Sequence, residues 1–173
     1  MELRNFIREV PDFPQPGILF RDITPLLADP AALRESVEVM SRPWRAQKID
    51  LIAAMEARGF MFGAAMAIRL GAGFVPVRKE GKLPWKTRAI SYTLEYRDDI
   101  LHVHEDAVRA GQRVLVVDDV IATGGTAGAV VELIRQLGGE VVGAQFLVEL
   151  AGLAGRDHLP ALEVRSVIRY EGT

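Results

Sequence analysis

Apolar residues follow two different spacings along this chain, and the spacings alternate. Short runs rich in β-branched and aliphatic residues predict buried strands, while apolar residues that recur every three or four positions predict helices. The expected strands lie at residues 49–55, 73–77, 114–117, 140–148 and 164–170. The expected helices follow Asp29-Pro30, span about 60–70 before Gly71, and span 127–137 before Gly138-Gly139. Asp29 is placed to cap the first of these helices, and the glycines are typical of helix ends.

Strands that alternate with helices predict an α/β fold with a mostly parallel central sheet and helices on both faces. Residues 114–117 need apolar cover on both sides, as strands in the middle of such a sheet do. A length of 173 residues predicts one domain, 1–173, with room for a sizeable core.

The N-terminal 30 residues do not fit this alternation. Residues 1–9 can form a short amphipathic helix that ends at Pro11, with Leu3 and Phe6 on its apolar side. Prolines then keep the chain extended to about residue 27, which makes it poor material for a central strand. We expect residues 1–30 to form a hood at the edge of a binding site, with Phe20 and Arg21 facing it.

A second departure spans about residues 79–105. Residues 88–96 and 101–105 each alternate as half-exposed strands, and Arg97-Asp98-Asp99 is a plausible turn between them. This pattern predicts a hairpin that stands off the sheet, and hairpins outside a core are candidates for mobile lids.

Composition and charge exclude several classes of protein. A formal charge of -2 provides no broad basic surface, so duplex nucleic acid is not an expected partner. The absence of cysteine excludes disulfides, thiolate catalysis and zinc–thiolate sites. We find no signal-peptide pattern and no apolar run long enough to span a bilayer, so we expect no membrane association and a cytoplasmic location.

The most informative stretch is the end of the 114–117 strand. Asp118 and Asp119 follow it directly, and the next residues include a run of small side chains that opens a helix, Ala122, Thr123, Gly124, Gly125 and Thr126. Backbone N–H groups at a helix start form a phosphate cradle. A glycine turn or an acidic pair alone is more often only a connection, but their conjunction is much rarer. The stretch matches neither the P-loop nor the dinucleotide fingerprint.

Cations follow two other predicted strands. Arg58 sits beside Gly59 after the 49–55 strand, and Lys79 and Lys82 follow the 73–77 strand. A single arginine more often pairs with a local acid, and a charge run is usually a solvated face. Carboxyl ends of parallel strands share one edge of the sheet, however, so we expect these cations and the acidic pair to face one polyanionic ligand with hydroxyl groups.

A hydrophobic strand followed by Asp-Asp and Ala-Thr-Gly-Gly-Thr resembles the ligand signature of the type I phosphoribosyltransferases. The whole chain is similar to the adenine-specific family among them, because five blocks occur in that family's order. These blocks lie at residues 13–27, 56–60, 78–84, 94–96 and 117–126, and they include Phe20-Arg21-Asp22-Ile23-Thr24-Pro25, Glu56-Ala57-Arg58-Gly59-Phe60 and Leu94-Glu95-Tyr96.

This resemblance implies transfer of 5-phosphoribose from phosphoribosyl pyrophosphate to adenine, which gives AMP and pyrophosphate. It implies that the loop from Ala122 to Thr126 binds the 5′-phosphate and that Asp118 and Asp119 hold the ribose hydroxyls. Arg58, Lys79 and Lys82 then take the pyrophosphate. Mg²⁺ would be bound mainly through phosphoribosyl pyrophosphate, and the protein would be a homodimer.

For the base, the resemblance implies that Phe20 stacks on adenine while the backbone around Leu19 and Arg21 reads its edge. Glu95 becomes the general acid or base at the purine ring, although by itself it would be an exposed carboxylate on a strand. Tyr96 helps to set the lid or packs in the core. The chain departs from the family pattern at Glu80, Trp85 and Arg97. These departures would affect the motion of the lid rather than the class of reaction.

Two other functions are compatible with part of this pattern. The same reaction on an oxopurine would also suit the phosphate loop, but residues 13–27 favour adenine. A non-catalytic regulator that senses phosphoribosyl pyrophosphate would usually need a nucleic-acid-binding part. His102 and His104 share one face of a strand without a third ligand nearby, so we expect a solvated strand face and no metal site.

Overall fold

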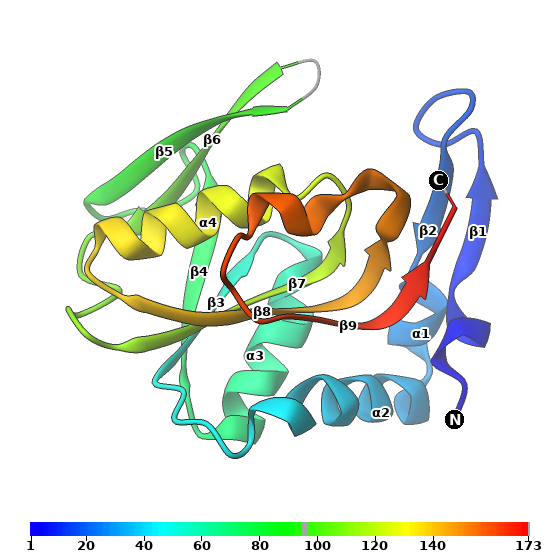
Figure 1. Ribbon diagram of the computed structural model, residues 1–173, viewed down its shortest axis with the longest axis horizontal. Helices are drawn as coiled ribbons and strands as arrows, with labels where there is room; N and C mark the ends of the chain where they lie inside the picture. Colours follow the sequence, from blue (N-terminus) through cyan, green and yellow to red (C-terminus); the bar gives the residue numbers. More distant parts are fainter. Residues whose placement is uncertain (95–96, 173) are drawn as a thin grey trace.

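A seven-stranded sheet forms the centre of the protein in the computed structural model, which describes residues 1–94 and 97–172 (Figure 1). The strand order is β5-β6-β4-β3-β7-β8-β9, and the neighbours from β4 to β9 run parallel. The strands are β3 (Leu51–Met55), β4 (Gly73–Lys79), β5 (Thr87–Leu94), β6 (Arg97–His104), β7 (Arg113–Ile121), β8 (Glu140–Leu150) and β9 (Val164–Tyr170). The predicted, mostly parallel sheet is confirmed.

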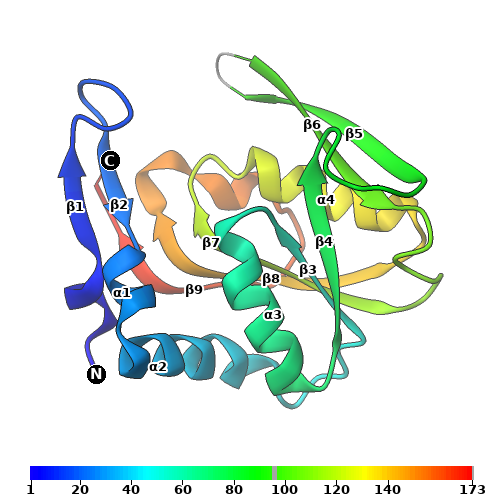
Figure 2. The ribbon, with the colours of Figure 1, turned by 180° about the vertical axis from the view of Figure 1, so that it is seen from behind.

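Helices cover both faces of this sheet, as predicted. One face lies under α4, and the other lies against α2 and α3 (Figures 1 and 2). The helices are α1 (Thr24–Ala28), α2 (Pro30–Ser41), α3 (Arg58–Leu70) and α4 (Gly125–Gln136), with 3₁₀ turns η1 (Leu3–Phe6), η2 (Arg42–Trp44), η3 (Ala151–Leu153) and η4 (Gly155–His158). Within residues 1–94 and 97–172, no helix is long and apolar enough to cross a membrane.

Two expected helix-end signals are confirmed, one at the start of α2 and one at the end of α3. The Asp29 carboxylate accepts hydrogen bonds from the backbone N–H groups of Ala31 and Ala32, at 3.0 and 2.8 Å, and so caps α2. Gly71 ends α3 with a φ of 69°. Trp44 lies just beyond α2 in η2, where it is fully buried.

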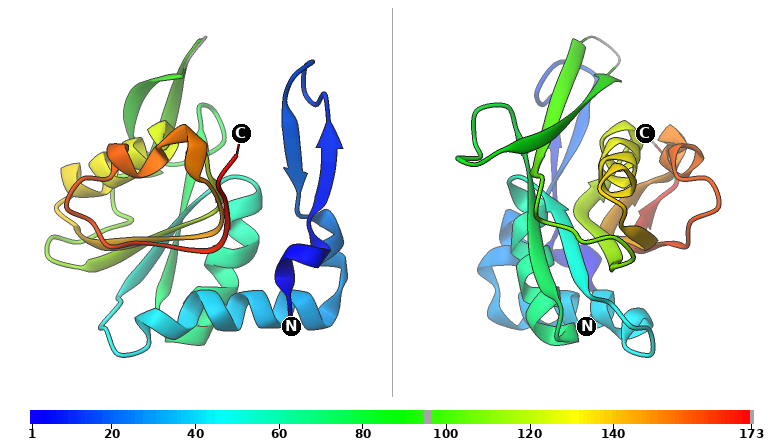
Figure 3. Two further views of the ribbon diagram at one scale, coloured as in Figure 1. Left: turned by 45° about the vertical axis from the view of Figure 1, so that its right-hand side comes forward. Right: turned by 90° about the vertical axis from the view of Figure 1, so that its left-hand side faces the viewer.

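The predicted helix over residues 1–9 is wrong beyond Phe6. A 3₁₀ turn occupies Leu3–Phe6, and β1 (Arg8–Pro11) then pairs antiparallel with β2 (Leu19–Asp22). The apolar spacing suited a helix locally, but pairing with a second strand further along the chain satisfies the backbone instead. Figure 3 shows this two-stranded sheet standing apart from the central sheet, close to the C-terminus.

The hairpin formed by β5 and β6 protrudes from the sheet edge, but it does not stand free of the sheet. Residues 78 and 79 of β4 pair with His102 and Leu101 of β6, and Leu101 is fully buried. The expected turn over residues 97–99 is wrong, because Arg97 already pairs with Leu94 and the next residues continue the ladder. The base of the hairpin therefore belongs to the core.

Strand β7 is longer than its apolar run predicts, and this places the acidic pair within the strand rather than after it. β3 pairs with β7 only as far as Val117, whereas β8 continues to pair through Asp118, Val120 and Ile121. The β-branched Val120 and Ile121 extend the strand along the long neighbour β8. Asp118 and Asp119 therefore project beyond the end of β3.

Candidate active site

A cavity of about 580 Å³ opens where β7 extends past β3, a size typical of ligand pockets. Most residues predicted to bind ligand line it together, from the N-terminal sheet, the start of α3, the end of β7 and the following loop. These residues are Leu19, Phe20, Arg21, Arg58, Asp118, Asp119, Ala122, Thr123, Gly124 and Thr126. Segments a hundred residues apart in the chain therefore share one wall.

Other predicted residues are not brought to this cavity. Lys79, Lys82 and Gly125 do not line it among the residues that the structure describes. Glu95 and Tyr96 lie outside the described residues.

Several lining residues were not predicted. They are mainly apolar, and most are sequence neighbours of predicted ones: Ile18, Met55, Val120, Ile121, Ala127 and Leu150. Leu150 carries no sequence signal, because only the parallel pairing of β7 with β8 brings the end of β8 to the site.

The two acids are held close to one another and to the start of α3. The Asp119 backbone N–H donates to Asp118 Oδ1 at 2.9 Å. A Cβ atom at Gly59 would lie 2.6 Å from the same Oδ1 and 3.3 Å from the Val117 carbonyl oxygen. The first turn of α3 approaches Asp118 this closely only because residue 59 has no side chain. The glycine beside Arg58 therefore makes room for a carboxylate.

Burial and the neighbouring charge of Asp119 raise the pKa of Asp118 well above its ordinary range, and the nearby Arg58 opposes this shift. Two adjacent carboxylates in one wall disfavour the doubly ionised state. In the absence of ligand, Asp118 therefore keeps its proton to a higher pH than an ordinary aspartate does. A cation or hydroxyl groups bound here would favour the ionised pair.

Arg58 connects the acidic pair to the aromatic wall of the cavity. Its Nε atom lies 2.6 Å from Asp119 Oδ2, and its Cζ atom lies 5.4 Å from the centroid of the Phe20 ring. Phe20 also packs edge-on against Phe13, with ring centroids 5.1 Å apart. One face of Phe20 is thus placed to stack on a planar group within reach of the acids.

The small-residue loop turns at Gly124, whose φ of 83° suits glycine, and α4 begins at the next residue. The N-terminal N–H groups of α4 and the loop lack partners within the helix, so they are available to an anion. The Thr126 hydroxyl donates to the Tyr92 hydroxyl of β5 at 3.2 Å. Tyr92 was not predicted near this loop, because its only signal is its place in the alternating 88–96 segment.

The cations at the end of β4 are tied to acids and do not themselves line the cavity. The Lys79 N–H donates to Glu56 at 2.5 Å, and the Arg78 guanidinium donates to the same carboxylate at 3.2 Å. Burial of Glu56 opposes ionisation, but these donors outweigh it and lower its pKa. The Lys79 ammonium lies 3.0 Å from an Asp99 carboxylate oxygen on β6.

The two histidines of β6 do not lie on the solvated strand face that we expected. Thr87 Oγ1 lies 2.9 Å from His102 Nδ1, and the Nε2 atoms of His102 and His104 are buried. Both residues are half-buried, so neither lies on a fully solvated face. In residues 1–94 and 97–172 no three acidic or histidine side chains gather in a way that could hold a metal ion.

Comparisons with known proteins agree with this geometry. The family model of the phosphoribosyl transferase domain matches residues 23–170. The adenine phosphoribosyltransferase of Rhodopirellula baltica is 54% identical over 99% of this chain and 84% of its own. The crystal structure of adenine phosphoribosyltransferase from Thermoanaerobacter pseudethanolicus has a TM-score of 0.95 at 52% identity, with 98% of each chain covered.

A third relative was solved with ligands. The adenine phosphoribosyltransferase of Saccharomyces cerevisiae, complexed with D-2,5-dideoxy-2,5-imino-altritol 1,6-bisphosphate and adenine, has a TM-score of 0.90 at 39% identity. The comparison covers 96% of this chain and 96% of the yeast chain.

Proposed function

The chain belongs to the adenine phosphoribosyltransferases within the phosphoribosyl transferase family, and from that premise we propose how its cavity carries out their reaction. The reaction transfers 5-phosphoribose from phosphoribosyl pyrophosphate to adenine and yields AMP and pyrophosphate. The observation that carries the assignment of roles is the conjunction of Asp118 and Asp119 with the 122–126 loop in one cavity wall.

The 5′-phosphate binds the loop that leads into α4. Ala122, Thr123, Gly124 and Thr126 line the cavity, and the first turn of α4 adds free N–H groups and the positive end of a helix dipole. The ribose hydroxyls bind Asp118 and Asp119. Carboxylates beside C1 also stabilise the positive charge that develops there as pyrophosphate departs.

Adenine occupies the part of the cavity between the N-terminal sheet and Arg58. Phe20 stacks on the ring, and the backbone of Leu19 and Arg21 reads its edge, since a peptide unit offers both a donor and an acceptor. Arg21 is held in place by an ion pair with Glu9 and by the Tyr170 ring, whose centroid lies 4.0 Å from its Cζ atom. Glu95 is the general acid or base for the purine, and Tyr96 helps to set the lid.

Pyrophosphate binds Arg58, and it recruits Lys79 from the end of β4 and Lys82 from the segment that follows. Lys79 must exchange the Asp99 carboxylate for pyrophosphate oxygens, so ligand binding and the base of the hairpin are coupled. Closure of the hairpin would complete this site and exclude water.

Mg²⁺ fits this site as a companion of the substrate rather than as a resident ion. The described residues contain no cluster that would enclose a metal, but the carboxylate oxygens of Asp118 and Asp119 are hard donors of the kind that Mg²⁺ prefers. When bound with phosphoribosyl pyrophosphate, the ion neutralises charge on the pyrophosphate. The cytoplasmic location stays a prediction.

The test is product formation with a choice of bases. With phosphoribosyl pyrophosphate and Mg²⁺, the protein should form AMP from adenine at least about 100-fold more efficiently than it forms IMP from hypoxanthine, because a site that reads hydrogen bonds rejects a base with the wrong pattern. A blank with EDTA should give no AMP. Equal use of hypoxanthine would contradict adenine specificity, and binding of phosphoribosyl pyrophosphate without release of pyrophosphate would favour a sensor.

A homodimer is supported by an apolar surface over α2 and α3. Met61 and Ile68 lie seven residues apart on α3, so they share one face, and they are 43% and 85% exposed. A shallow groove lined by Leu33 and Val37 of α2 adjoins Arg69. Light scattering should give twice the chain mass, and Ile68→Glu should shift the mass towards the monomer. A monomeric wild type would contradict the proposal.

A further inference from the structure

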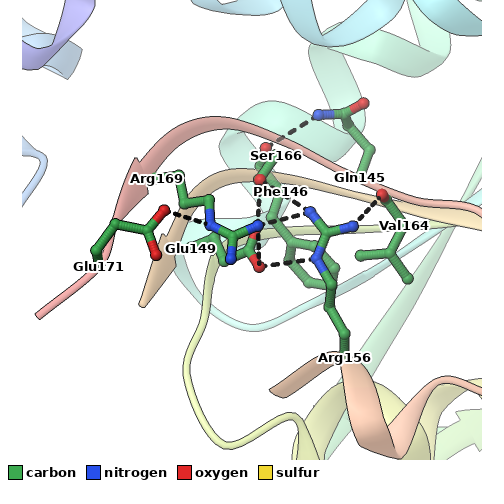
Figure 4. A network of polar contacts seen from close by, with 8 residues as sticks. All are labelled: Gln145, Phe146, Glu149, Arg156, Val164, Ser166, Arg169 and Glu171. Atoms are coloured by element: carbon green, nitrogen blue, oxygen red, sulfur yellow. Dashed lines mark hydrogen bonds and ion pairs between the residues drawn. The ribbon is translucent and has the colours of Figure 1, made fainter. Parts of the chain in front are cut away.

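Behind the phosphate loop, an ion pair between the half-exposed Arg156 and the buried Glu149 fastens the segment from Ala151 to His158 to the sheet. Arg156 Nε and Nη2 each donate to a different carboxylate oxygen of Glu149 at 2.7 Å, and Nη1 donates to the Val164 carbonyl oxygen at 2.8 Å (Figure 4). Ser166 donates to the same carboxylate. Arg156 thus joins its segment to both β8 and β9.

The carboxylate at the centre of this network is an ion that depends on its partners. The Glu149 side chain is 5% exposed. Hydrogen bonds from Arg156, and next from Ser166, lower its pKa to about 2 despite the opposing effect of burial. A buried charge without its partner is costly, so the network holds Arg156 in one place.

The segment that carries Arg156 lies directly against the loop. A Cβ atom at Gly124 would overlap the carbonyl oxygen of Gly155, and a Cβ atom at Gly155 would overlap the carbonyl oxygen of Ala122. A Cβ atom at Gly128, in the first turns of α4, would lie 3.1 Å from the His158 carbonyl oxygen. Backbone therefore packs on backbone, and a displacement of the segment would be felt by the loop.

Within the segment itself, hydrogen bonds are local. The Ala154 N–H donates to the Ala151 carbonyl oxygen at 3.1 Å, and the Asp157 N–H donates to the Ala154 carbonyl oxygen at 3.0 Å. Such bonds shape a turn but do not attach it to the sheet. Arg156 supplies that attachment, together with the buried Leu159 that follows.

We propose that Arg156 and Glu149 are positioning residues for the 5′-phosphate loop, an inference that rests on the phosphate role proposed above. Neither belongs to the residues that line the cavity in the described part of the chain. Their ion pair holds the segment against Ala122 and Gly124, so the loop is in its binding conformation before the phosphate arrives. A loop that must be ordered on binding loses affinity for the group that orders it.

The test compares two ligands that differ only in the 5′-phosphate. In Arg156→Gln, the inhibition constant of AMP should rise about tenfold, while that of adenosine should stay within twofold of wild type. The KM for phosphoribosyl pyrophosphate should also rise about tenfold, with kcat and the KM for adenine changed less than threefold. Arg156→Lys should raise the inhibition constant of AMP only about threefold. Its single ammonium group can still pair with Glu149, but it cannot donate to the Val164 carbonyl oxygen at the same time.

The matched control is Arg165→Gln, which removes another half-exposed arginine, one that lies in β9 and pairs with Glu163. It should leave both inhibition constants unchanged. If Arg156→Gln does not fold, Ser166→Ala can take its place, because it removes one donor to Glu149. It should raise the inhibition constant of AMP about twofold to threefold and leave that of adenosine unchanged.

The outcomes separate the inference from its premise. Equal losses for AMP and adenosine, or a lower melting temperature with both constants unchanged, would overturn the positioning role. A wild-type protein that bound AMP no better than adenosine would instead contradict the phosphate role of the loop.

Discussion

Replacing both Asp118 and Asp119 by asparagine should lower kcat/KM for phosphoribosyl pyrophosphate by about 10³-fold or more, equivalent to about 4 kcal/mol of transition-state stabilisation. The two carboxylates share one cavity wall with the phosphate loop. Asparagine keeps the shape and can still bond to hydroxyl groups, but it cannot stabilise the positive charge that develops at C1. Steady-state kinetics with pyrophosphate release as the readout measures the effect.

The matched control is Glu105→Gln with Asp106→Asn, which removes the same two charges from an adjacent, exposed acidic pair after β6. That variant should retain its activity within about twofold. A rate within tenfold of wild type for the Asp118 and Asp119 variant would refute the assigned role.

The Asp118 and Asp119 pair should also make the stability of the protein depend on pH. The pKa of Asp118 is raised above the ordinary value of 3.8, so the native state without ligand binds a proton more tightly than the unfolded chain does. Stability should therefore fall as pH rises from about 4 through the raised pKa. Asp118→Asn should lack this decline while it loses activity, which thermal unfolding as a function of pH can measure.

Removal of the Glu95 carboxylate, by Glu95→Ala or Glu95→Gln, should lower kcat about 10²-fold to 10³-fold and change the KM for adenine less than threefold. A general acid or base acts on the proton in transit, so its loss affects turnover more than binding. The pH profile of kcat/KM for adenine should lose one of its limbs in both variants.

Glu132→Gln is the matched control, because Glu132 is an exposed carboxylate on α4. It should behave as wild type. If kcat for Glu95→Gln stays within threefold of wild type and the pH profile is unchanged, Glu95 is not the general acid or base. It would then be only an exposed carboxylate on a strand.

Much of the fold could be predicted because the determining signals are local. The strand at 164–170 has the predicted bounds, and α3 ends before Gly71 as predicted although it begins two residues earlier, at Arg58. Burial on both faces and a glycine cap leave direct marks in neighbouring residues. The 1–9 helix and the 97–99 turn were wrong because each depended on strand pairing, which is decided by partners elsewhere in the chain.

Residue types along the chain are enough to indicate the class of fold and the chemistry that the site offers: an acidic pair, a small-residue loop at a helix start, and an arginine beside a glycine. Those features are contiguous, so their residue types alone limit what they can bind. The tertiary structure decided where they meet. Strand β7 continues along β8 beyond the end of β3, so Asp118 projects into the cavity and lies against Gly59. Leu150 and the Arg156–Glu149 pair come to the same end of the sheet. Such contacts join residues far apart in the chain, and no local pattern records them.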